Sequence, residues 1–138
     1  MEFVTKEQLL AAASAAAPRP FEIVECPELN WLIVVQGMSG IERDGWEKSL
    51  ISGRGKRREV NTENVRAKLA VKSIVDKPGG HGQRMFSDGE AVVLGQLRVD
   101  VLNKVYEAAQ RVNGVTDEDI DELKKSSELV AGSGSPTN

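Results

Sequence analysis

The longest regular pattern of hydrophobic positions lies between Val65 and Gly114. It predicts two helical segments, separated by a glycine-rich turn around PGGHGQ. In the second segment apolar residues recur every three or four positions, which places them along one side of a helix. This apolar stripe consists of Leu94, Leu97, Val101, Val105, Ala108 and Val112. Gly114 follows it at the position where a left-handed residue usually ends a helix.

Gly95 leaves two interpretations of the second segment open. The segment is either one continuous helix or a short helix that turns at Leu94-Gly95 into a longer one. Because Gly89 already lies in the first turn, two glycines would weaken one short helix. The pattern therefore favours a break at Leu94-Gly95.

Three helix starts are marked by a hydroxyl residue followed three positions later by Gln or Glu. In such a capping box each side chain accepts a hydrogen bond from a backbone N–H of the other residue. The pairs are Thr5 with Gln8, Ser39 with Glu42, and Ser87 with Glu90. They predict helices over about 6–16 and 41–51, and a helix after Ser87.

The remaining helices are predicted from caps and apolar faces. Asn61 or Thr62 is expected to cap a helix that ends before the sequence DKPGG, and Thr116 is expected to start the last helix. In the helix after Ser39, the expected buried face is Ile41, Trp46 and Leu50. In the helix before DKPGG, it is Ala67, Ala70, Val71 and Ile74.

Two strands are predicted near the N-terminus. FEIVEC (21–26) mixes apolar and acidic residues, and WLIVVQG (31–37) is a continuous apolar run, so a hairpin joined by CPELN is expected. Because a lone hairpin is marginal in water, it must lie against helices. The sequence thus predicts an α+β fold, an N-terminal β-hairpin packed against a mostly helical domain of about five helices. We expect one domain over 1–128 and a flexible tail over 129–138.

Length and charge narrow the class of protein. A chain of 138 residues can bury one modest core. A net charge of -3 gives no general attraction to nucleic acid or to an anionic membrane. No apolar run approaches the roughly 20 residues of a membrane-spanning helix. We therefore expect a cytosolic protein that does not bind a membrane.

Residues with catalytic or metal-binding chemistry are few and scattered. His81 is the only histidine, so neither a metal site nor a Ser-His-Asp arrangement is predicted. Cys26, the only cysteine, lies among Glu22, Glu25 and Glu28, and a structural role is expected. We predict a non-enzymatic protein without a cofactor.

A basic loop, GRGKRR, occupies residues 53–58. It lacks the first glycine and the final Ser or Thr of a phosphate-binding loop. A nucleic-acid-binding module that uses Arg54, Lys56, Arg57 and Arg58 is an alternative, but no aromatic residues are interleaved for base stacking. The interpretation as a solvated loop is preferred.

Several short segments, taken in order, resemble the tail assembly chaperone family of long-tailed bacteriophages. These segments are VECPEL (24–29), GMSGIERD (37–44), SIVD (73–76), MFSD (85–88), Leu94-Gly95 and AAQRVNG (108–114). The resemblance covers about residues 5–126. The loop at 53–58 and the extra glycines of PGGHGQ depart from the simplest family pattern.

The resemblance implies a protein of the host cell cytoplasm that binds the tape-measure protein, helps the tail tube protein polymerise around it, and is absent from the mature virion. The apolar stripe is then open to two interpretations: a stripe at helical spacing is usually core, and the alternative is a face that receives a partner helix. On the second interpretation the candidate partner-binding residues are Leu94, Leu97, Val101, Val105, Ile120 and Leu123. Self-association into oligomers is a further expectation, and a structural tail or head-tail connector protein is the alternative function.

Overall fold

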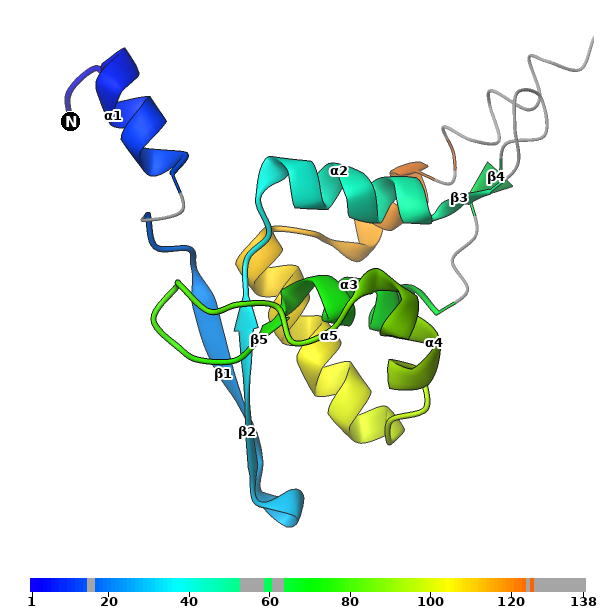
Figure 1. The fold of residues 1–138 in the computed structure, drawn as a ribbon. Helices are drawn as coiled ribbons and strands as arrows, with labels where there is room; N and C mark the ends of the chain where they lie inside the picture. Colours follow the sequence, from blue (N-terminus) through cyan, green and yellow to red (C-terminus); the bar gives the residue numbers. More distant parts are fainter. Residues whose placement is uncertain (15–16, 53–58, 61–63, 124, 126–138) are drawn as a thin grey trace, which may run out of the picture.

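The computed structural model describes residues 1–14, 17–52, 59–60, 64–123 and 125 (Figure 1). It confirms the α+β class, with strands packed on a mostly helical body. The helices are α1 (Lys6–Ala12), α2 (Gly40–Ser49), α3 (Val65–Ser73), α4 (Ala91–Leu94), α5 (Val99–Asn113) and a last helix over 117–123. The strands are β1 (Phe21–Cys26), β2 (Trp31–Gln36), β3 (Ile51–Ser52), β4 (Glu59–Val60) and β5 (Ile74–Val75).

The predicted hairpin is present. β1 and β2 pair antiparallel, with Phe21 opposite Gln36 and Cys26 opposite Trp31. A short 3-10 helix (Pro27–Leu29) joins them, and Asn30 reverses the chain with φ of 57°. Asparagine tolerates this left-handed conformation better than most residues. The hairpin register alternates side chains between the two faces of the sheet.

A third strand, β5, was not predicted. Ile74 and Val75 pair antiparallel with Val35 and Val34, which gives the sheet order β1-β2-β5. The sequence pattern extended the preceding helix through these residues, but α3 ends at Ser73. A strand of only two residues has no periodicity of its own, so its pairing depends on the hairpin beside it.

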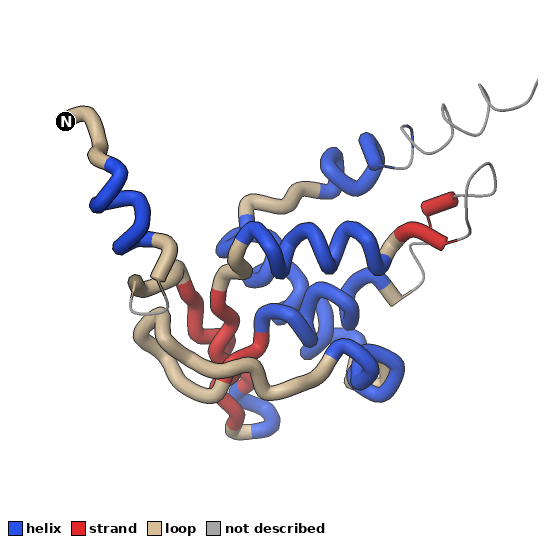
Figure 2. The backbone as a smooth tube through the Cα atoms, turned by 45° about the horizontal axis from the view of Figure 1, so that its top comes forward, coloured by secondary structure: helices blue, strands red, loops and turns tan. Residues whose placement is uncertain are grey.

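The core lies between the helices and one face of the sheet (Figure 2). α5 packs against β1, β2 and α3, and α3 also packs against α2 and α4. The predicted buried face of α3 is confirmed, because Ala67, Ala70 and Val71 are buried and Ile74 remains buried in β5. In α2, Trp46 and Leu50 are buried as predicted.

Two details of the helix predictions are corrected. Ile41 is 85% exposed, so it does not belong to the buried face of α2. As the second residue of that helix it lies at the end remote from Leu50, where none of the described elements covers it. The predicted caps Asn61 and Thr62 lie outside the described residues, and α3 follows Asn64, whose φ is 57°.

The break at Gly95 is confirmed. α4 ends at Leu94, and α5 begins only at Val99. A Cβ at Gly95 would lie 2.5 Å from Oδ1 of Asn64, so the break also lets the chain approach α3 closely. Gly114 ends α5 with φ of 64°, as expected for a helix that terminates in a left-handed residue.

The three predicted capping boxes are present at Thr5, Ser39 and Ser87. At Ser87 the box opens a 3-10 turn (Asp88–Glu90) that leads into α4. Thr116 starts the last helix as predicted: its backbone N–H donates to the Asp119 carboxylate at 2.8 Å, and its hydroxyl accepts from the Asp119 N–H at 3.1 Å. The predicted flexible tail over 129–138 lies outside the described residues.

Candidate protein-binding surface

The two faces of the sheet have different environments. Val24, Cys26 and Val35 point toward the helices and are buried. In the antiparallel register, directly opposed residues share a face, so the other face carries the pairs Phe21–Gln36, Ile23–Val34 and Glu25–Leu32. No helix of the described residues packs on this outer face.

Among the described residues, the loop that follows β5 covers one end of the outer face (Figure 2). The Gln36 amide holds this loop through two hydrogen bonds with Gly82: Nε2 donates to Gly82 O at 3.1 Å, and Oε1 accepts from Gly82 N at 2.9 Å. Val75 is buried beneath the loop. The remainder, which we call the open sheet face, consists of Phe21, Ile23, Leu32 and Val34.

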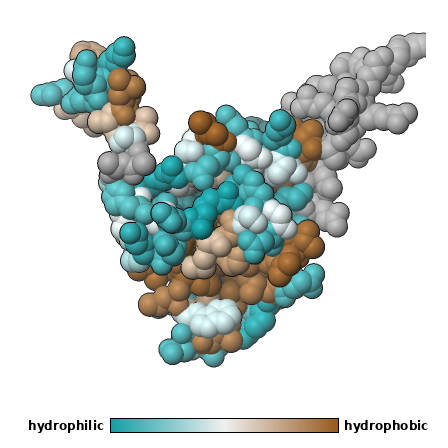
Figure 3. All heavy atoms as spheres, viewed as in Figure 1, coloured by the Kyte–Doolittle hydropathy of each residue, from teal (hydrophilic) through white to brown (hydrophobic). Residues whose placement is uncertain are grey.

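The open sheet face is apolar and accessible. Leu32 is 70% exposed, Ile23 is 48% exposed and Phe21 is 39% exposed, while Val34 is half-buried between them. Glu25, opposite Leu32, is the charged residue among the three pairs of this face. Figure 3 shows hydrophobic side chains gathered over the strands and over α4, where Val92 and Val93 are also exposed. Exposed apolar surface of this kind makes the open sheet face a candidate protein-binding surface.

The apolar stripe of the sequence is mostly core. Leu94, Val101 and Val105 are buried, with exposures of 7%, 2% and 0%, and they join the main hydrophobic cluster. In this fold these three side chains match the first interpretation of the stripe, as core, and present no surface to a partner. The physical reason is that α5 uses its apolar side to cover the inner face of the sheet and α3. Leu97 is partly buried against the same core.

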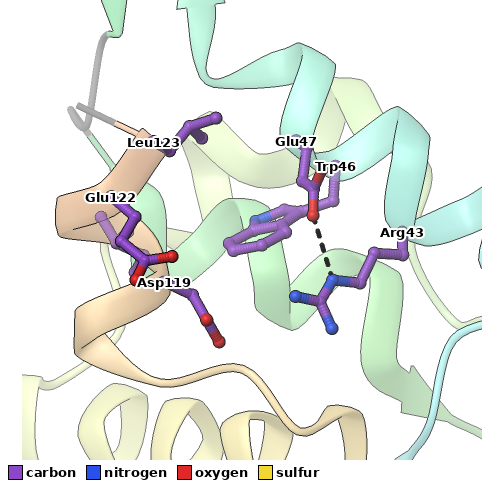
Figure 4. A pocket seen from close by; sticks show the side chains of 7 residues that line it. Arg43, Trp46, Glu47, Asp119, Glu122 and Leu123 are labelled. Carbon is purple, nitrogen blue, oxygen red and sulfur yellow. Dashed lines mark hydrogen bonds and ion pairs between the residues drawn. The ribbon is translucent and has the colours of Figure 1, made fainter. Parts of the chain in front are cut away.

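Ile120 and Leu123, the other two predicted partner-binding residues, line a groove between α2 and the last helix (Figure 4). The groove has a volume of about 340 Å³. Trp46 lies in it and is 2% exposed, and within the described part of the chain its Nε1 has no hydrogen-bond partner. The side chains of Ile120 and Leu123 are partly buried against the core, so they offer less exposed apolar surface than the open sheet face does.

Three charged residues of the groove, Arg43, Glu47 and Asp119, are already engaged. Arg43 pairs with Glu47 at 3.2 Å and donates to the carbonyl oxygen of Asn113 at 3.1 Å. Hydrogen bonds from Thr116 lower the pKa of Asp119, which caps the last helix. The bonds of Arg43 hold α2 against the end of α5, and those of Asp119 fix the start of the last helix, so both residues have a structural role.

His81 and Cys26 are the other candidate residues for catalytic or metal-binding chemistry. His81 is exposed in its loop, and Cys26 is a buried free cysteine with 3% exposure. Among the described residues, no group of three or more His, Cys, Asp or Glu side chains is arranged to hold a metal ion. The basic loop at 53–58 lies outside the described residues. In the same described part, no helix has the length and hydropathy needed to cross a bilayer.

The open sheet face had a signal in the sequence. The run WLIVV is apolar at every position, although a strand covered by helices on one side needs apolar residues only at alternate positions. A continuous run therefore means either a second covered face or an exposed apolar one. Among the described residues, α3 and α5 pack on the inner side of the sheet, and this packing decides for the second possibility.

Comparisons with protein-family models, curated proteins and solved structures found no significant match to this chain.

Proposed function

We propose that this protein is a non-enzymatic chaperone of phage tail assembly that binds the tape-measure protein and helps the tail tube protein polymerise around it. The open sheet face is the observation that supports this proposal most directly, because it presents apolar side chains to solvent on a folded domain. The sequence resemblance supplies the identity of the partner. No step of this role makes or breaks a covalent bond.

The chemistry of the face suits a helical partner. Phe21, Ile23, Leu32 and Val34 form a shallow apolar surface against which one side of an amphipathic helix can pack. A tape-measure protein is long and helical, and its apolar side needs cover until the tube encloses it. Many copies, each bound weakly through its small face, cover such a partner together. Because each contact is weak, the copies still dissociate when the tube replaces them.

Co-expression with a helical segment of the tape-measure protein tests the proposal. The wild-type chain is expected to co-purify with the segment and to raise its soluble yield. The double substitution Ile23→Glu with Leu32→Glu places two carboxylates on the open sheet face and should abolish both effects, because docking would bury unpaired charge. Its circular dichroism should stay that of the wild type, since both side chains are solvent-exposed.

Ile41→Glu is the matched control. Ile41 is an equally apolar residue with 85% exposure, but it lies on α2 away from the sheet. The Ile41→Glu variant should co-purify with the tape-measure segment as the wild type does. A wild-type chain that neither co-purifies with the segment nor improves its solubility would refute the proposed function, and equal binding by the double variant would refute the assigned surface.

The proposed role also fixes where the protein is found. A chaperone acts in the host cytoplasm and leaves before the particle is complete, whereas a structural tail or head-tail connector protein stays in the virion. Mass spectrometry of purified particles should therefore detect the tube and tape-measure proteins without this chain. Its presence at a stoichiometric level would favour the structural role.

A further inference from the structure

α1 is a well-formed helix that packs on no other element of the described part of its chain. Its capping box is complete, with the Thr5 N–H donating to Gln8 at 2.8 Å, yet none of its residues is buried. Figure 1 shows α1 standing away from the rest of the molecule. A helix of seven residues is too short to be stable alone in water, so this one needs a surface to pack against.

One side of α1 and the residues before it are apolar. Leu9 and Leu10 are 59% and 62% exposed, and Phe3 and Val4 precede the cap and are exposed as well. Lys6 is one turn before Leu9 and Leu10, so it lies on the same side of the helix. The helix thus presents aliphatic side chains together with one positive charge.

The open sheet face has the complementary character. It is apolar, it is uncovered, and its charged neighbour is Glu25, which is exposed. When Leu9 and Leu10 pack on Ile23 and Leu32, Lys6 also faces the sheet, where Glu25 is the charged residue of the outer face. α1 and the open sheet face are therefore complementary: both are apolar and uncovered among the described residues, and Lys6 and Glu25 carry opposite charges.

The connection between α1 and β1 disfavours docking on the same copy. The backbone N–H of Arg19 donates to Gly80 O at 3.0 Å, and the Gly37 N–H donates to Pro20 O at 2.8 Å. Arg19 also pairs with Glu42 at 2.6 Å. These contacts fix the chain just before β1 beside the loop that covers the upper end of the outer face. The chain therefore becomes free of the body only on the N-terminal side of Pro18.

Ala13 to Ala17 is the connection that remains, and its five residues span at most about 17 Å. Within that length α1 would have to reverse its direction and pass the loop at Gly80 to reach its own open sheet face. A second copy imposes neither requirement. We propose that α1 of one copy docks on the open sheet face of a second copy, and that the exchange is reciprocal in a symmetric dimer.

This self-association does not depend on the tape-measure protein, although both proposals use the open sheet face. A docked α1 covers the face in the free protein, and a tape-measure helix would displace it. Leu9→Glu with Leu10→Glu separates the two proposals, because this variant loses the docking helix and keeps the face. It should be monomeric and still capture the tape-measure segment.

Sedimentation equilibrium of the purified full chain measures the association, over about 1–100 μM, where interfaces of this small size dissociate. The wild type should shift from monomer to dimer as its concentration rises across this range. The pairs Leu9→Glu with Leu10→Glu and Ile23→Glu with Leu32→Glu should each remain monomeric. The control Ala11→Glu, on the opposite side of α1, should dimerise like the wild type. A monomeric wild type, or a dimer that survives both double variants, would overturn the proposal.

Cross-linking identifies the copy that receives α1. A chain with Leu10→Cys is mixed with a differently tagged chain with Leu32→Cys and treated with a short bismaleimide; the native Cys26 is buried. A product that contains both tags supports exchange between copies. If only a chain with both substitutions reacts, and reacts within itself, α1 docks on its own sheet and the proposal is wrong.

Discussion

At the scale of single residues, Asn113 connects three parts of the chain. Its Oδ1 accepts a hydrogen bond from the Met38 N–H at 2.6 Å, and its Nδ2 donates to Ala109 O at 2.8 Å and to Ser73 Oγ at 3.3 Å. The end of α5 is thereby joined to the end of α3 and to the segment after β2. Ser73 is fully buried, and all three bonds are at least partly shielded from solvent.

Asn113→Ala should lower the free energy of unfolding by about 1–3 kcal/mol, because it leaves the Met38 N–H without its acceptor. Urea denaturation followed by circular dichroism measures the change. Asn103→Ala is the control: Asn103 lies on the same helix and accepts a bond from Arg66 in an exposed position. Equal effects of the two substitutions would contradict the role given to Asn113.

Gly82 is a second residue on which the sheet depends. A Cβ there would lie 2.6 Å from Lys77 O and 2.6 Å from Cγ2 of Val75. Gly82→Ala should therefore displace the loop and cost about 1–3 kcal/mol through overpacking. In Gly89→Ala the new Cβ meets nothing within 4 Å, so the melting temperature should stay close to that of the wild type. Thermal unfolding of both variants tests this difference.

At the scale of elements, α5 determines which apolar surfaces are left for a partner. Its buried residues are Val101, Leu102, Val105, Ala108 and Ala109. They cover the inner face of the sheet and α3, so the strongest hydrophobic pattern of the sequence contributes to stability. The outer face of the hairpin receives none of the described helices, and its apolar residues are exposed to solvent.

Two valines of α5 test this division. Val105 is fully buried, whereas Val99 is 62% exposed. Val105→Ala should reduce the free energy of unfolding by at least about 1.5 kcal/mol, because two buried methyl groups are each worth about 0.8 kcal/mol. Val99→Ala should change it by less than about 0.5 kcal/mol. Denaturant titrations of the two variants measure both changes. A large loss of stability in Val99→Ala would contradict this placement of the core.

At the scale of the whole molecule, ion pairs connect elements that are distant in sequence. Arg19 before β1 pairs with Glu42 of α2, and Arg111 of α5 pairs with Glu22 of β1 at 2.9 Å. Hydrogen bonding from Arg111 lowers the pKa of Glu22. For Glu42, burial opposes ionisation, but hydrogen bonds from Ser39 and Arg19 outweigh it and lower the pKa. Both carboxylates are therefore more acidic in the folded state than in the unfolded chain.

Stability should consequently fall in acid. A carboxylate with a lowered pKa contributes its full stabilisation above its ordinary pKa, 4.5 for Glu42, and loses it as the pH drops through the folded value. We expect the melting temperature to be constant near neutrality and to decrease below about pH 4.5. Glu42→Gln should be less stable at neutral pH and should show a weaker decrease in acid. An unchanged acid profile in this variant would contradict the assignment.

The sequence alone determined most of the local structure. Caps at Thr5, Ser39 and Ser87, the break at Gly95 and the end at Gly114 depend on residues within a few positions of one another, so their signals are local. The hairpin was predictable for the same reason, because its strands are joined by a short turn.

Only the tertiary structure decided which apolar residues are buried and which remain exposed. Periodicity shows that Val105 and Leu32 are apolar, but burial depends on the element that lies opposite each of them. α5 buries Val105 against the inner face and leaves Leu32 uncovered on the outer one. The strand at Ile74 and Val75 likewise depends on distant partners, Val34 and Val35 on one side and Arg84 on the other. Contacts between distant segments leave no local pattern, and the candidate binding surface is made by them.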